Sequence, residues 1–385
     1  MNFELDDEHR MLKELVRRFV DSALMPLEHR VLEREATGQS PALTPEEAAK
    51  VDAVSRDMGL WGLDAPVDVG GVDLPAVAMV GVNEEIGRTV VPYTLPPDSP
   101  NLRMLMATVT ERQREAYLAP YVRGETISAI GISEPGAGSD PAAMTTKAVR
   151  DGDDWVLSGR KIWISRAAEA DFTIVMAVTG RHGERSAISA FLVDRETPGF
   201  NVLRRIPMIG GQATYEVALD DCRVPGWKLL GTEGAGFAPM QLRLGTRRIE
   251  MAAWSIGMAQ RALDMMIDFA PQRSTFGQKL SERQAVQFWV ADAATRIHAA
   301  RLMTYDCAWK LDQGGDVRLE ISMIKADAIE MAWTVVDHAM QLFGAMGMTR
   351  ELPLHLMASR LRTMRIYDGP TEIHKWVVAR SLLRG

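Results

Sequence analysis

The chain has 385 residues, of which 46% are hydrophobic, 6% aromatic and 25% charged, proportions that predict a globular protein of about two or three domains and exclude a disordered or collagen-like one. Its net charge of −7 argues against nucleic-acid binding, which usually needs a basic excess. The two cysteines, Cys222 and Cys307, are too few for a disulfide framework or a zinc ligand set and favour a reducing compartment.

The beginning of the chain carries no recognisable targeting segment. Residues 1–10 (MNFELDDEHR) are acidic and polar, whereas a signal peptide starts with positive charge followed by an apolar run. No uncharged apolar run in the sequence reaches the roughly 18 residues that span a bilayer. We therefore predict a cytoplasmic protein without a membrane span.

Helical signals dominate the first third of the chain. Apolar residues between positions 5 and 20 repeat at helical spacing. Thr44, followed by a proline and two glutamates, predicts the start of a second helix, and Thr110 with Gln113 forms a capping-box pattern. A further helix is expected over residues 76–87, after a loop rich in glycine and proline.

The pattern changes near Gly124 to short runs of β-forming residues separated by turns. Asp151-Gly152 and Ser158-Gly159 stand where tight hairpin turns are expected. The runs cover residues 126–132, 155–157, 172–178, 187–193 and 216–219. Strands this short and this closely spaced predict a compact β-barrel or sandwich.

After Gly236 the chain returns to long helices with apolar residues at helical spacing. Four of them predict an antiparallel bundle, and they cover residues 241–269, 282–311, 319–343 and 373–383. The fold class that we predict is α+β and multidomain, with an N-terminal helical domain over residues 1–124, a central β-barrel over 125–232 and a C-terminal four-helix bundle over 233–385.

Residues 131–143 (GISEPGAGSDPAA) form the most informative segment. They follow a predicted strand, and small residues at a strand end let a flat ligand approach free backbone N–H groups. An ordinary surface turn rich in glycine and proline is the alternative. The segment lacks the G-x-G-x-x-G pattern and the βαβ context of a Rossmann site.

This segment resembles, position by position, the signature of the acyl-CoA dehydrogenase family, flavoproteins that desaturate acyl-CoA thioesters. Five further segments are similar to the family, and together they span nearly the whole chain. They are KIWIS at 161–165, GTEGAGF at 231–237, RSTFG at 273–277, QLFGAMG at 341–347 and RIYDG at 365–369. The family's order of helical domain, β-barrel and helical bundle is also the order predicted above.

The resemblance implies an FAD cofactor held by two sets of residues. The flavin ring and pyrophosphate set contains Ile130, Ile132, Ser133, Gly138, Ser139, Trp163 and Ser165. The second set would bind the adenosine and pyrophosphate of the FAD of a neighbouring subunit, and it contains Arg273, Phe276, Gln284, Gln341 and Gly344. Glu372 is one more expected cofactor contact. Because FAD shared between subunits requires two chains, the resemblance implies a dimer or a dimer of dimers.

The same resemblance places the catalytic base at Asp368. In the family a carboxylate removes the α-proton of the acyl group while flavin N5 takes the β-hydrogen as hydride, and aimed donors stabilise the charge that develops on the thioester oxygen. Arg248 corresponds to an arginine beside this carboxylate, where it would favour the ionised form. The residues expected to contact substrate are Ser139, Arg248, Tyr367 and Gly369.

Asp368 departs from the commonest family pattern, which has glutamate at this position. Aspartate is one methylene shorter, so an unchanged backbone would leave its carboxylate about 1 Å short, and such a displacement can cost on the order of 10²-fold in rate. A subgroup similar to enzymes of hydroxylated acyl-CoAs has the same Asp-Gly-Pro segment, and nitroalkane oxidases also use aspartate. Asp-Gly-Pro is in addition a good helix-capping turn.

Other candidate sites are less specific. Arg247 occupies the position where some family members carry their base, and arginine cannot act as a base at neutral pH. Ser158 with Lys161 and Ser322 with Lys325 match the S-x-x-K pattern of serine acyl-enzymes, which often arises by chance. The seven histidines show no metal-binding spacing, so no metal site is expected.

We therefore predict an FAD-dependent acyl-CoA dehydrogenase of fatty acid β-oxidation, with Asp368 as base and an electron-transfer flavoprotein as electron acceptor. Three alternatives stay open. One is another flavin chemistry on the same fold, such as that of an oxidase or a nitroalkane oxidase. The second is a flavin-binding subunit of a heteromer in which Asp368 is idle, and the third is an S-x-x-K hydrolase without flavin. Acyl chain length, branching and hydroxylation are left open.

Overall fold

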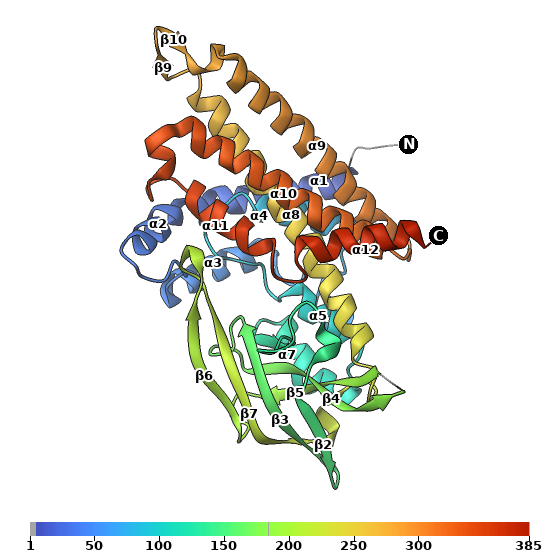
Figure 1. The fold of residues 1–385 in the computed structure, drawn as a ribbon. Helices are drawn as coiled ribbons and strands as arrows, with labels where there is room; N and C mark the ends of the chain where they lie inside the picture. Colours follow the sequence, from blue (N-terminus) through green and yellow to red (C-terminus); the bar gives the residue numbers. More distant parts are fainter. Residues whose placement is uncertain (1–4, 184, 385) are drawn as a thin grey trace.

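The structure is a computed structural model that describes residues 5–183 and 185–384. Figure 1 shows a large β-sheet at one end of the molecule and a body of long helices at the other. Helices from the beginning of the chain pack beside helices from its end, and α5 and α7 lie next to the sheet. None of the described helices combines the length and the apolar character needed to cross a membrane.

The N-terminal part is helical, as predicted. The predicted helix start at Thr44 and the predicted capping box at Thr110 are both confirmed. Thr44 and Glu47 exchange hydrogen bonds of 3.2 and 3.0 Å at the start of α3, and Thr110 and Gln113 exchange hydrogen bonds of 2.9 and 3.4 Å at α6. Each box satisfies backbone N–H groups that a helix start leaves open. The helices are α1 Asp7–Phe19, α2 Glu28–Ala36, α3 Pro45–Asp57, α4 Ala76–Ile86, α5 Ser99–Met106, α6 Glu111–Gln113 and α7 Ala119–Val122.

The middle of the chain forms one eight-stranded sheet in the order β6-β7-β3-β2-β4-β5-β8, with β1 paired in parallel to β4. All five predicted β-forming runs coincide at least in part with strands. The strands are β1 Ser128–Gly131, β2 Lys147–Asp151, β3 Asp154–Ile164, β4 Phe172–His182, β5 Arg185–Asp194, β6 Phe200–Pro207, β7 Ala213–Pro225 and β8 Leu229–Leu230.

The sheet curves around a core of its own, because each strand from β1 to β7 contributes buried apolar side chains to one cluster, among them Ala129, Ala148, Leu157, Val175, Phe191, Phe200 and Val217. The opposite face of β4 is buried as well. Ile174 and Met176 pack with Leu102 of α5 and Tyr121 of α7. Alternate residues of one strand therefore join the β core to the N-terminal helices.

One of the two predicted hairpin turns is confirmed and the other is wrong. Asp151 pairs with Asp154 across the β2–β3 turn, where Gly152 has a φ of 63°. Ser158-Gly159 instead lies inside β3, at a register shift against β7. A Cβ on Gly159 would lie 2.5 Å from the Thr146 hydroxyl, so close approach of a neighbouring segment, and not a turn, requires glycine here.

The C-terminal part contains the four predicted helices and a fifth that was not predicted. The four are α8 Phe237–Phe269, α9 Gln284–Asp312, α10 Arg318–Phe343 and α12 Thr371–Leu383, the fifth is α11 Leu354–Met364, and a small hairpin of β9 Ser274–Thr275 and β10 Gln278–Lys279 follows α8. Val16 of α1, Ile256 of α8 and Ile329 of α10 share one core. The two ends of the chain thus form a single helical body.

Candidate active site

A buried ion pair fixes the loop that follows β1. Lys161 of β3 lies 2.8 Å from Glu134 and also donates to the Ile132 carbonyl at 3.1 Å. Glu134 accepts from the backbone N–H groups of Thr145 and Thr146 at 2.6 and 2.9 Å. Although burial acts in the opposite direction, Lys161 and these donors lower the pKa of Glu134 to about 2. A charged anchor thus holds both ends of the loop.

The end of β3 lies against the same loop. The Ile162 N–H donates to the Ser133 carbonyl at 3.0 Å. Trp163 has a φ of 63° and its side chain is 53% exposed. The structure therefore brings together five residues of the first predicted cofactor set, namely Ile130, Ile132, Ser133, Trp163 and Ser165, while Gly138 and Ser139 lie in the exposed outer part of the loop.

A cleft of about 1000 Å³ joins this region to the predicted base segment. Ser165, from the end of β3, and Tyr367, the residue before Asp368, both line it. Further walls come from Tyr93, in the loop between α4 and α5, and from Trp254 of α8 and Arg360 of α11. A cleft of this size between packed domains is where a cofactor and a substrate are expected to bind.

Asp368 lies in the turn between α11 and α12 and is nearly buried. Its φ is 53° and that of Gly369 is 95°, so two successive residues of the turn have left-handed backbone conformations. Glycine adopts such a conformation freely. Arg243 of α8 donates to Oδ1 of Asp368 at 2.9 Å, and the two side chains are 10% and 14% exposed. The sequence analysis did not single out Arg243, because nothing local marks a partner from a distant helix.

Three donors hold the backbone of this turn. Arg248 Nε donates to the Asp368 carbonyl at 2.9 Å, and His374 Nε2 lies 3.2 Å from the same oxygen. Lys325 Nζ donates to the Gly369 carbonyl. Burial lowers the pKa of Lys325 to about 8, and burial together with Arg248 and Lys325 lowers the pKa of His374 to about 4. Arg248 therefore contacts the main chain of Asp368, whose carboxylate is paired with Arg243.

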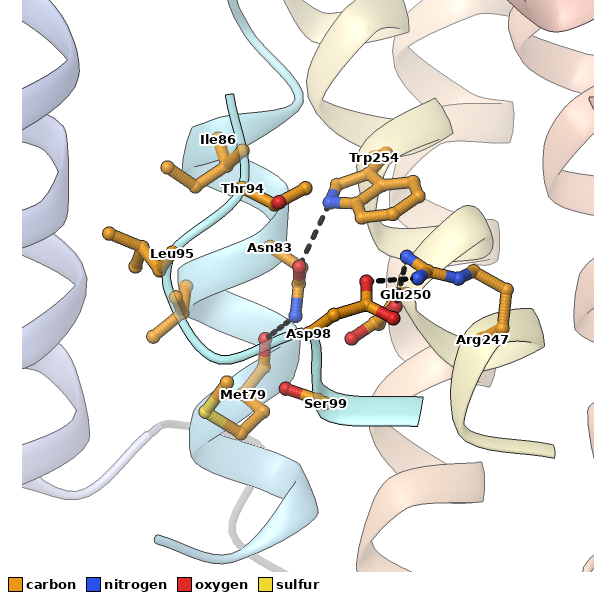
Figure 2. Close-up of a pocket in the computed structure, with 11 residues that line it drawn as sticks. Met79, Asn83, Ile86, Thr94, Leu95, Asp98, Ser99, Arg247, Glu250 and Trp254 are labelled. Carbon is orange, nitrogen blue, oxygen red and sulfur yellow. Dashed lines mark hydrogen bonds and ion pairs between the residues drawn. The ribbon is translucent and has the colours of Figure 1, made fainter. Parts of the chain in front are cut away.

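Deeper in the molecule, α8 carries a second buried charge cluster, shown in Figure 2. Arg247 forms an ion pair with Asp98, from the loop before α5, and donates a hydrogen bond of 2.8 Å to Oε2 of Glu250, one turn along α8. Trp254 and Asn83 lie beside it and are joined by a hydrogen bond of 2.9 Å. Arg247 is thus a cation with two of its N–H groups directed at these carboxyl groups.

The second predicted cofactor set gathers at the far end of the helical body. Phe269 and Phe343 stack with ring centroids 4.2 Å apart, which brings the ends of α8 and α10 together. The residues of the set are all exposed there, Phe276 completely, and they are Arg273, Phe276, Gln284, Gln341 and Gly344. Figure 1 places the adjacent β9–β10 hairpin at the opposite end of the molecule from the large sheet. Glu372 is exposed in the first turn of α12.

Comparisons with known proteins agree with this architecture along the whole chain. Models of the acyl-CoA dehydrogenase N-terminal, middle and C-terminal domains match residues 6–125, 129–222 and 234–383. The chain is 42% identical to (R)-benzylsuccinyl-CoA dehydrogenase of Thauera aromatica, over 100% of this chain and 97% of that protein.

Solved structures give the same result. Butyryl-CoA dehydrogenase from Megasphaera elsdenii superposes with a TM-score of 0.90 at 29% identity, over 100% of both chains. A glutaryl-CoA dehydrogenase from Mycobacterium smegmatis, solved in complex with FADH2, gives a TM-score of 0.86 at 25% identity, over 99% of this chain and 96% of that one.

The fold and the cleft define an oxidoreductase that acts on CH–CH bonds of acyl-CoA thioesters. The chain belongs to the acyl-CoA dehydrogenase family, whose members depend on FAD.

Proposed function

We propose that Asp368 is the base of this acyl-CoA dehydrogenase and that the cleft beside it holds FAD and the acyl group. The observation that carries the proposal is the position of the Asp368 carboxylate, which is nearly buried, paired with Arg243 at 2.9 Å and directly follows a residue of the cleft wall. A base must lie where the substrate can reach it and must be held in a fixed position, and the charge-assisted hydrogen bond from Arg243 holds this carboxylate in place.

The residues around the end of β3, where Ser165 lines the cleft, fit FAD. Trp163 offers an exposed aromatic face, and Ser133 and Ser165 offer hydroxyl groups beside it. The loop over residues 135–140 consists mostly of small residues and is exposed except at Ala137, and a Cβ on Gly136 or Gly138 would meet no neighbour within 4 Å. Bound FAD would supply the acceptor for the β-hydrogen, which leaves as hydride.

The turn itself supplies donors for the thioester oxygen. Among the described residues, no backbone acceptor takes the N–H groups of Asp368 or Gly369. Preorganised N–H groups aimed at an oxygen that gains negative charge lower the barrier, and each such donor contributes roughly 3–4 kcal/mol. We propose that these N–H groups bind the thioester oxygen while the Asp368 carboxylate accepts the α-proton.

The same proposal extends to a second subunit and to the electron acceptor. The β9–β10 hairpin, beside the second expected set, lies at the other end of the molecule from the sheet whose strands β1 and β3 carry the first set. A second copy would therefore bring its hairpin end to the cleft of the first. Ser139 and Tyr367 would contact substrate, and Glu372 the cofactor. Electrons would leave the flavin for an electron-transfer flavoprotein.

The experiment is anaerobic flavin reduction by a panel of acyl-CoAs, for the wild type and Asp368→Asn. The variant keeps the size of the side chain and loses the base, so the reduction rate should fall by about 10²–10⁴-fold, while flavin and acyl-CoA still bind. Asp337→Asn, on an exposed position of α10, is the matched control. An unchanged rate in Asp368→Asn would refute the assignment, and fast reoxidation of the wild type by oxygen would indicate an oxidase.

A further inference from the structure

We propose that the acyl pocket recognises an acyl chain with an oxygen substituent beyond Cβ, and that Asp98, Arg247 and Glu250 bind this oxygen. The inference rests on the proposed function, since it takes the cleft beside Asp368 to be the acyl site. It concerns the class of acyl group and assigns the three residues to specificity, separately from the proton transfer.

The cluster lies where an acyl chain would extend from the cleft. A small cavity between α4 and α8 is lined by Asn83, Thr94, Asp98, Arg247, Glu250 and Trp254, as Figure 2 shows. Three of these residues, Thr94, Asp98 and Trp254, also line the large cleft that contains Tyr367. Asp98 is therefore the member of the charged cluster that lines both spaces, and it connects Arg247 and Glu250 of the deeper cavity to the cleft.

The charged groups that line the deeper cavity and its opening to the cleft are poorly matched to a plain alkyl chain. The side chains of Asp98 and Arg247 are each 13% exposed and that of Glu250 is 9% exposed. Arg247 donates to Oδ1 of Asp98 and to Oε2 of Glu250, while the other oxygen of each carboxylate accepts no hydrogen bond from the described residues. An alkyl chain that displaced water here would leave these oxygens without partners, which is unfavourable.

The protonation states make the cluster both a donor and an acceptor. Burial raises the pKa of Glu250 to about 8, although Arg247 acts in the opposite direction. The pKa of Asp98 is lowered, because Arg247, Arg166 and Arg243 outweigh the effect of burial. At neutral pH, Glu250 can therefore donate an O–H, Arg247 its N–H groups, and Asp98 can accept. A hydroxyl satisfies both kinds of partner, and a carboxylate can take the donors.

The test compares acyl-CoAs that differ only in the substituent. Hexanoyl-CoA, hydroxyhexanoyl-CoAs with the hydroxyl at each carbon beyond Cβ, and adipoyl-CoA are assayed for kcat/KM with the holoenzyme. We expect one oxygenated substrate to exceed hexanoyl-CoA by about tenfold or more, since a site built to hydrogen-bond rejects the analogue without the group. Comparison of the hydroxyhexanoyl-CoAs with adipoyl-CoA distinguishes a neutral from an anionic substituent. A preference for either one supports the proposal.

Two nearly isosteric variants, Asp98→Asn and Glu250→Gln, separate recognition from structure. In at least one of them, the ratio of kcat/KM between the oxygenated substrate and hexanoyl-CoA should fall towards one, mainly because KM for the oxygenated substrate rises. If Asp98→Asn fails to fold, Glu250→Gln still decides, because glutamine resembles the protonated glutamate. A wild type that uses hexanoyl-CoA as well as or better than every oxygenated substrate overturns the proposal, as does a preference that both variants retain. Failure of the proposed function is a different result, namely undiminished flavin reduction in Asp368→Asn.

Discussion

At the scale of single residues, the position of Asp368 depends on groups that touch its main chain. Arg248, His374 and Lys325 bind two successive carbonyls of the turn, and both residues of that turn are left-handed. A carboxylate one methylene shorter than glutamate depends strongly on where its backbone is held, since displacements near 1 Å can cost about 10²-fold in rate. In the proposed mechanism these three side chains position the base, and none of them exchanges a proton.

His374 gives this arrangement a measurable pH dependence. The unfolded chain binds a proton at this histidine below pH 6.5, whereas the folded chain does so only near pH 4. Between these values the unfolded state holds more protons, so stability falls as the pH falls, by up to about 3 kcal/mol. At pH 7 we expect the wild type to have a higher unfolding midpoint than His374→Gln. This difference should disappear as the pH is lowered to 4.5. Parallel pH responses of the two proteins would contradict this.

At the scale of elements, the Lys161–Glu134 pair links β3 to the loop after β1. Lys161→Met would leave the Glu134 charge buried without its cation, and breaking such a pair costs about 3–5 kcal/mol. We expect a lower unfolding temperature and weaker FAD binding, measured by thermal unfolding and flavin titration.

Two comparisons make the Lys161 experiment specific. Lys147→Met, an exposed lysine on the neighbouring strand β2, should change neither quantity. The double variant Glu134→Gln, Lys161→Met should recover part of the stability, because no unpaired charge remains. Full FAD affinity in Lys161→Met would show that the loop does not depend on this anchor.

The sequence predicted elements wherever the signal was local. The helix start at Thr44 and the capping box at Thr110 can each be recognised within four residues of sequence, and both are present. The prediction of a turn at Ser158-Gly159 was wrong, because glycine also occurs inside strands where a neighbouring segment approaches closely. Helix α11 was missed although Leu354, Met357 and Leu361 are buried at helical spacing, because it is short and follows a turn-rich segment. The candidate site residues were predicted from the family resemblance and not from residue spacing alone.

The partners that complete the site are distant in sequence and could not be predicted from local patterns. Arg243 and Asp368 are 125 residues apart, and Arg247 and Asp98 are 149 apart. Their pairing depends on how α8 packs against the turn before α12 and against the loop before α5. Periodicity identifies that such helices exist, but the facing residues follow only from the packed structure.

At the scale of the whole molecule, the two expected cofactor sets make a prediction about assembly. The set around Arg273 adjoins the β9–β10 hairpin, at the other end of the molecule from the sheet whose strand β3 carries Trp163, so one site would need two copies. Arg273→Glu and Trp163→Glu should each bind FAD weakly and have little activity. Mixed assemblies should regain up to about a quarter of wild-type activity, because each mixed pair holds one intact site. If mixing restores nothing, the site is complete within one chain.

The most direct measurement of the central claim follows the α-proton itself. The enzyme is incubated anaerobically with an acyl-CoA that reduces it, in deuterated water, and the recovered acyl-CoA is analysed by mass spectrometry. Asp368 as base predicts deuterium at the α-carbon with the wild type and only the uncatalysed background with Asp368→Asn. Exchange at the wild-type rate in the variant would contradict the account, because another group would then be removing the proton.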